Sequence, residues 1–173
     1  MLNFVLSFIK IVAEYFKTFL KTTNHLLKIE SDEHAIKAIS FVKELEEPSD
    51  IQPEILLKAQ KELQKYFDGD LKEFSLKLEP EGTDFQKKVW ALLYKIPFGK
   101  TWTYAEMANK LGDPKVIRAA ASANGKNPVA IVIPCHRVIG TNGSLTGYAG
   151  GLENKRYLLD LENRVANGVM ELF

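Results

Sequence analysis

The chain contains a single cysteine, Cys135, which is followed directly by His136 and Arg137. The thiolate is the nucleophilic form of cysteine, and neighbouring cationic side chains favour it over the thiol. Adjacent residues of an extended chain point in opposite directions, so a bridging water could carry a proton between Cys135 and His136. A lone cysteine is also a common small apolar residue of protein cores. These residues alone therefore leave a nucleophilic role and a packing role open.

The cysteine count limits what other chemistry the chain can support. One cysteine cannot form a disulfide within the chain, which fits a reducing, cytoplasmic setting. A cysteine-based zinc site would have to take its remaining ligands from His25, His34 and His136. Such a site would lack ligands, so we expect no metal ion. No cofactor is expected either.

The composition is that of a folded protein with a local excess of positive charge. Hydrophobic residues make up 46% of the 173 residues and charged residues 26%, which excludes a disordered tail. At this length one domain, or two small ones, can bury a core. The formal net charge is +1, but residues 95–150 carry seven Lys/Arg against two acidic residues. This region is expected to present an anion-binding surface.

The spacing of polar residues predicts an amphipathic helix over residues 1–22. Polar side chains recur every three or four positions from Asn3 to Lys21, and apolar residues occupy the other side. We expect this helix to dock on the body of the protein or on a second copy, which would give a dimer. Contact with a membrane surface is the alternative, which the weakly basic polar face disfavours. The segment is too polar to span a membrane and lacks the features of a signal peptide.

Residues 23–80 predict a small α/β domain made of a hairpin and a helix. Apolar and polar residues alternate within residues 25–42 around a central polar turn, which is typical of a β-hairpin. Pro53 is placed to begin a helix with one apolar face, and Gly69 is placed to end it. A further short strand is expected at Phe74–Leu78.

A domain boundary is expected at Pro80–Gly82, and the residue patterns that mark the starts of helices are clearest after it. Thr83 with Gln86, and Thr103 with Glu106, have the spacing of a capping box, in which each side chain satisfies a free N–H of the other residue. Each pair predicts the start of a helix.

A third helix is predicted from Asp113 to Gly125, with Pro114 at its first position. Together with the helix that starts at Thr103, it gives a helix-turn-helix outline. Within this third helix, the segment Arg118–Ala123 contains four alanines, and Arg118 is the one long basic side chain of that segment. Alanine favours helix formation and close packing. A helix without bulk could also enter a nucleic-acid groove, so both interpretations stay open at this point.

The cysteine lies between a predicted strand and a flexible loop. Val129–Ile133 is expected to form a short buried strand that Pro134 ends. A glycine-rich loop over residues 141–151 follows the cysteine. It leads into a last amphipathic helix that carries Glu162 near its end.

The eight residues Ile133–Gly140 (IPCHRVIG) strongly resemble the active-site signature of the O⁶-alkylguanine-DNA alkyltransferases, also called methylated-DNA–protein-cysteine methyltransferases. The resemblance extends over about residues 83–162. Its other motifs are Tyr104, Arg118, Gly125–Pro128 and Tyr148–Gly151. The resemblance implies an α/β N-terminal domain followed by a mainly helical winged-helix or helix-turn-helix DNA-binding domain, residues 83–166, that carries the active site.

The resemblance also implies a role for each matching side chain. Cys135 would take the alkyl group from the O⁶ atom of a damaged guanine. His136 would act through a water as general base, with Glu162 bonded to its far nitrogen. Asn127 would brace the turn near the cysteine, and Tyr104 would donate a proton or hydrogen bond to the departing base. Positioned proton transfer of this kind accelerates reactions roughly 10²–10⁴-fold.

The partner implied is double-stranded DNA that contains O⁶-alkylguanine, with the O⁴ position of thymine as a further candidate. The base would be extruded, because its reactive atom lies inside the duplex. Arg118 would fill the vacated position from the minor groove. The other residues expected to contact DNA are Lys115, Ala119, Ala123, Tyr148 and Ala149.

These inferences predict a cytoplasmic, monomeric DNA-repair transferase that acts once per molecule, with no obligatory protein partner. The first alternative is an alkyltransferase-like protein that binds lesions without chemistry. Because relatives of that kind replace the nucleophile, Cys135 argues against it. The second alternative is a cysteine hydrolase. The third is a DNA-binding regulator, which would leave Cys135–Arg137 without a role.

Overall fold

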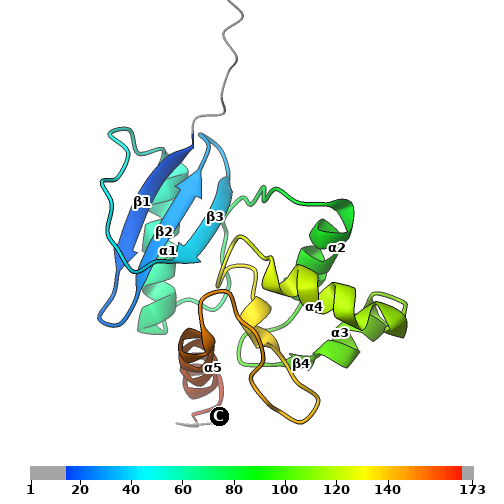
Figure 1. The fold of residues 1–173 in the computed structure, drawn as a ribbon. Coiled ribbons are helices and arrows are strands. Elements are labelled where there is room, and N and C mark those ends of the chain that lie inside the picture. Colours follow the sequence, from blue (N-terminus) through cyan, green and yellow to red (C-terminus); the bar gives the residue numbers. More distant parts are fainter. Residues whose placement is uncertain (1–14, 169–173) are drawn as a thin grey trace, which may run out of the picture.

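The computed structural model describes residues 15–168, which form a sheet-containing lobe and a helical lobe (Figure 1). Its strands are β1 (Phe16–Lys21), β2 (Leu26–Ser31), β3 (Ile36–Phe41), β4 (Trp102–Thr103) and β5 (Val138–Ile139). Its α-helices are α1 (Glu54–Asp68), α2 (Asp84–Leu93), α3 (Tyr104–Lys110), α4 (Ile117–Gly125) and α5 (Leu152–Asn167). Two 3₁₀ helices complete the fold: η1 (Pro114–Val116) and η2 (Cys135–Arg137). The expected α/β region followed by a mainly helical region is confirmed.

The first lobe is an antiparallel sheet in the order β1-β2-β3, with α1 covering one face (Figure 1). Leu27 and Ile29 alternate with half-buried polar residues along β2 and are fully buried. The α1 helix starts after Pro53 and ends at Gly69, whose φ of +84° is readily adopted only by glycine. The predicted hairpin and helix are therefore confirmed.

The amphipathic helix predicted over residues 1–22 is wrong for the residues that the structure describes. Residues 1–14 lie outside the described part of the chain. Phe16–Lys21 form β1 and pair with Leu26–Ser31 over six residues. β1 and β2 form a hairpin around residues 22–25, and the helical spacing of the polar residues contained no information about this pairing. Within the described range, no helix has the length and apolar character needed to cross a bilayer.

Two predicted strands are reduced to single bridges along the free edge of β3. Instead of a strand at Phe74–Leu78, only Leu78 forms a bridge, to Ile36. Instead of a strand at Val129–Ile133, only Val129 forms a bridge, to Ile39, and the chain then turns. Phe74–Leu78 alternates between apolar and exposed polar residues, whereas Val129–Ile133 is a continuous apolar run. Neither pattern shows whether the segment finds enough partners to form a strand.

The second lobe is built from α2, α3 and α4. The capping boxes at Thr83 and Thr103 are both formed, so the predicted starts of α2 and α3 are confirmed. Asp113 caps η1, which leads directly into α4. Ala120 and Ala123 of α4 are buried against α2, where the Trp90 indole donates a hydrogen bond to the carbonyl of Ala123 at 2.9 Å.

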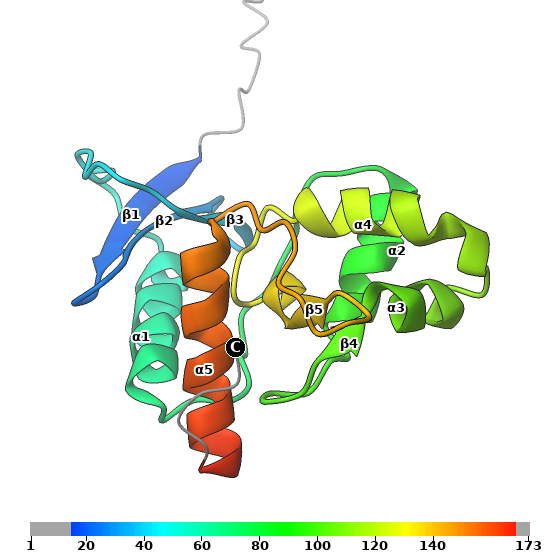
Figure 2. The same ribbon diagram turned by 60° about the horizontal axis from the view of Figure 1, so that its bottom comes forward.

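The last helix, α5, returns to the first lobe and lies beside α1 (Figure 2). Leu158 and Leu161 are buried, and they belong to the same apolar core as Leu63 of α1 and Leu93 of α2. The parallel pair β4–β5 links the start of α3 to the segment that follows Cys135. One core therefore joins the two lobes in residues 15–168.

We predict that Gly99→Ala destabilises the fold more than Gly112→Ala does. Both glycines have a positive φ, +71° and +93°, so each alanine should cost roughly 1–2 kcal/mol for the left-handed backbone. A Cβ at Gly99 would lie 2.5 Å from the Cβ of Ala166, whereas nothing lies within 4 Å of a Cβ at Gly112. The clash should add roughly 1–3 kcal/mol at Gly99 alone. Urea unfolding of both variants measures the difference, and equal losses would contradict it.

Candidate active site

A strained turn places Cys135 at the start of η2. Ile131 has a φ of +71°, and among residues 15–168 it is the one non-glycine residue in the left-handed region. This conformation is unfavourable for a β-branched residue, so the fully buried packing of Ile131 must hold it. The Cys135 N–H then donates to the carbonyl of Ile133 at 2.8 Å. The turn fixes the direction in which the thiol leaves the backbone.

Asn127 braces this turn from inside. Its Nδ2 donates to the carbonyl of Ile133 at 2.8 Å and to Sγ of Cys135 at 3.0 Å, and its Oδ1 accepts from the N–H of Val129 at 3.0 Å. The same side chain therefore holds the backbone on both sides of the strained turn and contacts the sulfur. The position predicted for Asn127 agrees with this geometry.

The Cys135 side chain is 4% exposed, and burial raises the pKa of its thiol to about 11. The hydrogen bond from Asn127 acts in the opposite direction but is the weaker effect. The cationic residues next to Cys135 in the sequence were expected to favour the thiolate, but in the fold burial has the larger effect on its pKa. At neutral pH the sulfur carries its proton, and a base must remove that proton before the sulfur can act as a nucleophile.

His136 is a suitable base. Its Nε2 lies 2.9 Å from Oε1 of Glu162, and both side chains are buried. An ionised carboxylate only accepts hydrogen bonds, so Nε2 carries the proton and Nδ1 carries the lone pair. Nδ1 is buried and has no hydrogen-bond partner in the described part of the chain. Burial lowers the pKa of His136, which keeps the ring neutral and able to accept a proton at neutral pH.

Glu162 is the centre of the buried hydrogen-bond network. Its Oε1 accepts from His136, from Nη2 of Arg137 at 2.9 Å and from the hydroxyl of Tyr66 at 2.8 Å. Its Oε2 accepts from Nε of Arg137 at 2.8 Å and from the N–H of Gly99 at 3.1 Å. Burial alone would raise the pKa of Glu162, but His136 and Arg137 outweigh it and hold this pKa well below its usual range.

Arg137 does not assist the cysteine in the way that the sequence suggested. Its guanidinium binds both oxygens of Glu162 and donates to the carbonyl of Ile96 at 2.6 Å. Because successive residues of a 3₁₀ helix point in different directions, the position next to His136 does not place Arg137 against the sulfur. Its charge compensates the buried carboxylate instead.

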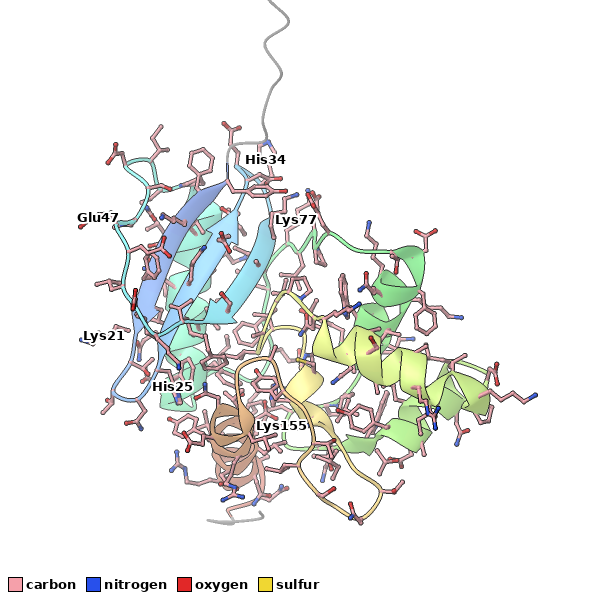
Figure 3. The ribbon with its side chains drawn as sticks, in the orientation of Figure 1. Lys21, His25, His34, Glu47, Lys77 and Lys155 are labelled. Atoms are coloured by element: carbon pink, nitrogen blue, oxygen red, sulfur yellow. The ribbon has the colours of Figure 1, made fainter. Side chains whose placement is uncertain are left out.

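Lys155 is a site residue that the sequence analysis missed. It belongs to the first turns of α5 (Figure 3), and its ammonium donates to the carbonyls of Val138 at 2.7 Å and Thr146 at 2.8 Å. Burial lowers its pKa to about 8, and the negative charge that Cys135 can carry opposes this shift. A lysine on the apolar face of a predicted helix was the signal that could have identified it.

Two tyrosines lie near the sulfur. Tyr104, at the start of α3, is half-buried and interacts with the side chains of Thr146 and Asn124. The hydroxyl of Tyr148 is buried and has no hydrogen-bond partner within residues 15–168. Burial raises the pKa of both hydroxyls, and the charge of Cys135 raises it further. Both therefore stay protonated and can donate hydrogen bonds at neutral pH.

The residues expected to contact DNA are divided between the surface and the core. Lys115, Arg118 and Ala119 are exposed along η1 and α4, and Ala149 is exposed in the loop before α5. Ala123 is 3% exposed and packs in the core, so the prediction that it contacts DNA is wrong. Within the described range, no group of three His, Cys, Asp or Glu side chains is arranged to hold a metal ion.

A buried cysteine that is followed directly by a buried histidine–carboxylate pair is a residue set of the kind that cysteine nucleophiles use. Comparison with known proteins specifies its family. A model described as the DNA-binding domain of 6-O-methylguanine DNA methyltransferase matches residues 84–164. A methylated-DNA–protein-cysteine methyltransferase of Methanosarcina acetivorans is 50% identical over 136 residues, which cover 76% of this chain and 87% of that protein. Its namesake in Mycobacterium tuberculosis H37Rv is 51% identical over 112 residues, 65% of this chain and 68% of that protein.

Solved structures agree with these matches. The crystal structure of Mycobacterium tuberculosis O⁶-methylguanine methyltransferase superposes with a TM-score of 0.79 at 38% identity, over 90% of this chain and 97% of that one. The M. tuberculosis protein in complex with DNA gives a TM-score of 0.75 at 40% identity, over 88% and 94%. The chain therefore belongs to the methylated-DNA–protein-cysteine methyltransferase family, which confirms the resemblance seen in its sequence.

We predict that the fold loses stability as the pH falls below about 6.5. The pKa of His136 is lower in the folded protein than its ordinary value of 6.5, so the unfolded chain takes up this proton first. Glu162 changes the stability in the same direction. Its stabilising effect is present above its ordinary pKa of 4.5 and is lost as the pH falls through its lower folded-state pKa. Urea unfolding between pH 7 and pH 4 measures the loss. A free energy of unfolding that does not change over this range would contradict the prediction.

Proposed function

We propose that this chain repairs O⁶-alkylated guanine in double-stranded DNA by transferring the alkyl group to its own Cys135. One observation carries the proposal: Asn127 donates a hydrogen bond to Sγ of Cys135, and the next residue, His136, is paired with the buried Glu162. Membership of the methyltransferase family supports the reaction type. No metal or cofactor is required, because one bond to the alkyl carbon forms as another breaks.

The reaction balances with groups that the chain itself supplies. His136, through a water, takes the thiol proton as the sulfur attacks the alkyl carbon. A carbon–sulfur bond forms, and the bond between that carbon and guanine O⁶ breaks. The departing guanine takes a proton from Tyr104, which is protonated before the reaction, and leaves as the neutral base. The proton taken up by His136 then returns through water to Tyr104, so the net change is transfer of the thiol proton to guanine. Glu162 stabilises the imidazolium that forms on His136, and Asn127 stabilises the thiolate.

DNA would reach this site through the exposed face of η1 and α4. We propose that α3 and α4 act as a helix-turn-helix within a winged-helix domain and enter the minor groove, which is about 6 Å wide. Lys115 would contact phosphates, Ala119 would allow close approach, and Arg118 would occupy the place of the extruded base. Tyr148 and Ala149 would contribute to the wall of the base pocket. A monomer without a protein partner suffices for these steps.

The first test measures how many methyl groups each chain accepts. With excess duplex DNA containing O⁶-methylguanine, each chain should gain one methyl group on the peptide that contains Cys135 and then stop. The thioether formed has a poor leaving group, and the chain has no second thiol that could exchange with it. Intact-mass and peptide mass spectrometry measure the product.

The same assay separates the alternatives. Many repaired guanines per chain would favour a cysteine hydrolase, and tight binding with an unmodified Cys135 would favour a lesion binder without chemistry. Duplex DNA containing O⁴-methylthymine tests the second candidate substrate. Cys135→Ser provides the control in which folding and DNA binding are retained and no mass is gained.

The second test separates base extrusion from chemistry. Arg118→Ala should slow repair of duplex DNA by at least tenfold, because the vacated position is then unfilled and extrusion costs a few kcal/mol. Reaction with free O⁶-benzylguanine should change little, since a free base does not need to be extruded. Arg164, exposed on α5, provides the matched control Arg164→Ala. Equal losses on duplex and free base would remove the role proposed for Arg118.

A further inference from the structure

Tyr66 connects the first lobe directly to the active-site network. It lies on α1, its side chain is fully buried, and its hydroxyl donates to Oε1 of Glu162 at 2.8 Å. The two residues are 96 positions apart in the chain. Nothing in the local sequence around Tyr66 indicates a role in chemistry.

Packing explains the ring of Tyr66 but does not explain where its hydroxyl lies. The ring contacts those of Phe67, Phe74 and Phe98, with centroids 5.5–6.0 Å apart. A phenylalanine could make all of these contacts. A buried tyrosine hydroxyl does require a partner, and a backbone carbonyl is the common choice. Here the partner is the carboxylate that holds His136.

The hydroxyl also completes the set of donors around this carboxylate. Oε1 lies between Tyr66, Nη2 of Arg137 and Nε2 of His136, and Oε2 is held by Nε of Arg137 and by Gly99. Arg137 alone would fix the plane of the carboxylate. Tyr66 adds a neutral donor at the oxygen that faces the imidazole, so it determines how much of the negative charge the imidazole experiences.

We propose that Tyr66 is a positioning residue of the transfer reaction: through Glu162, it fixes the orientation and the basicity of His136. This inference rests on the proposed function, because it assigns His136 as the base. The first lobe would then contribute to catalysis as well as to stability. Glu162 would be held by α1, by η2 and by the loop before β4.

The proposal predicts the direction of the change when the hydroxyl is removed. Without the Tyr66 donor, Oε1 retains more negative charge and binds the His136 proton more strongly. The protonated form of His136 is then favoured, so its pKa rises and less of the free base is present. The carboxylate is also less constrained, so the imidazole is less well oriented.

The test is Tyr66→Phe, measured as the single-turnover rate of methyl transfer to Cys135 between pH 5 and pH 8. The rate at pH 7 should fall on the order of tenfold, the size expected for a lost hydrogen bond to a charged group. The acidic limb of the profile should move to higher pH by about 0.5 unit or more. Tyr157→Phe is the matched control, because Tyr157 lies on α5 against His25 and does not contact Glu162.

Two further measurements distinguish positioning from general stability. In a Glu162→Gln background, Tyr66→Phe should cause little additional loss of rate, because the carboxylate through which it acts is absent. The chain has three histidines, so NMR can follow the His136 titration directly. Its midpoint should be higher in Tyr66→Phe than in the unaltered protein. An unchanged midpoint together with an unchanged acidic limb would overturn the proposal.

Different measurements test the role of Tyr66 and the proposed function. If the unaltered protein gains no mass on Cys135, the proposed function fails, and the NMR titration still tests the link between Tyr66 and His136. If Tyr66→Phe does not fold, the hydroxyl proton of Tyr66 in the unaltered protein provides the test. Its resonance should shift with the same midpoint as His136, and a resonance that does not shift overturns the inference.

Discussion

The structure depends on one buried negative charge, that of Glu162. An isolated carboxylate in a protein interior is strongly unfavourable, so its partners must be supplied by the fold. They come from α1, from the loop before β4 and from η2, and their hydrogen bonds hold three distant segments of the chain against α5. The same contacts orient His136. Stability and catalytic geometry therefore depend on the same interaction.

The state of Cys135 follows from its burial in this framework. Burial raises the pKa of the Cys135 thiol to about 11, which disfavours the reactive thiolate at neutral pH. Reactivity then depends on a base and on stabilising donors that act when substrate fills the site. Asn127 donates to the sulfur, and the charge of the Lys155 ammonium acts on the pKa of the thiol. In the proposed reaction, the cysteine would therefore become reactive only with substrate in the site.

Local signals in the sequence predicted much of the fold. The capping residues Thr83 and Thr103, and Gly69 at the end of α1, act within one turn of the chain, so their effect can be recognised without tertiary structure. The errors concern β1 and the segments at Phe74–Leu78 and Val129–Ile133. Whether those residues form a strand depends on pairing with β2 or β3, which their own periodicity does not determine.

The sequence by itself determined the family and the residues of the signature, because the order of these residue types along the chain is specific. Only the tertiary structure decided how they act. It placed Arg137 on Glu162, it buried Ala123, and it brought Tyr66 and Lys155 to the site from other helices. The physical reason is that burial and hydrogen bonding set the pKa of each group. Both depend on neighbours that are distant in sequence.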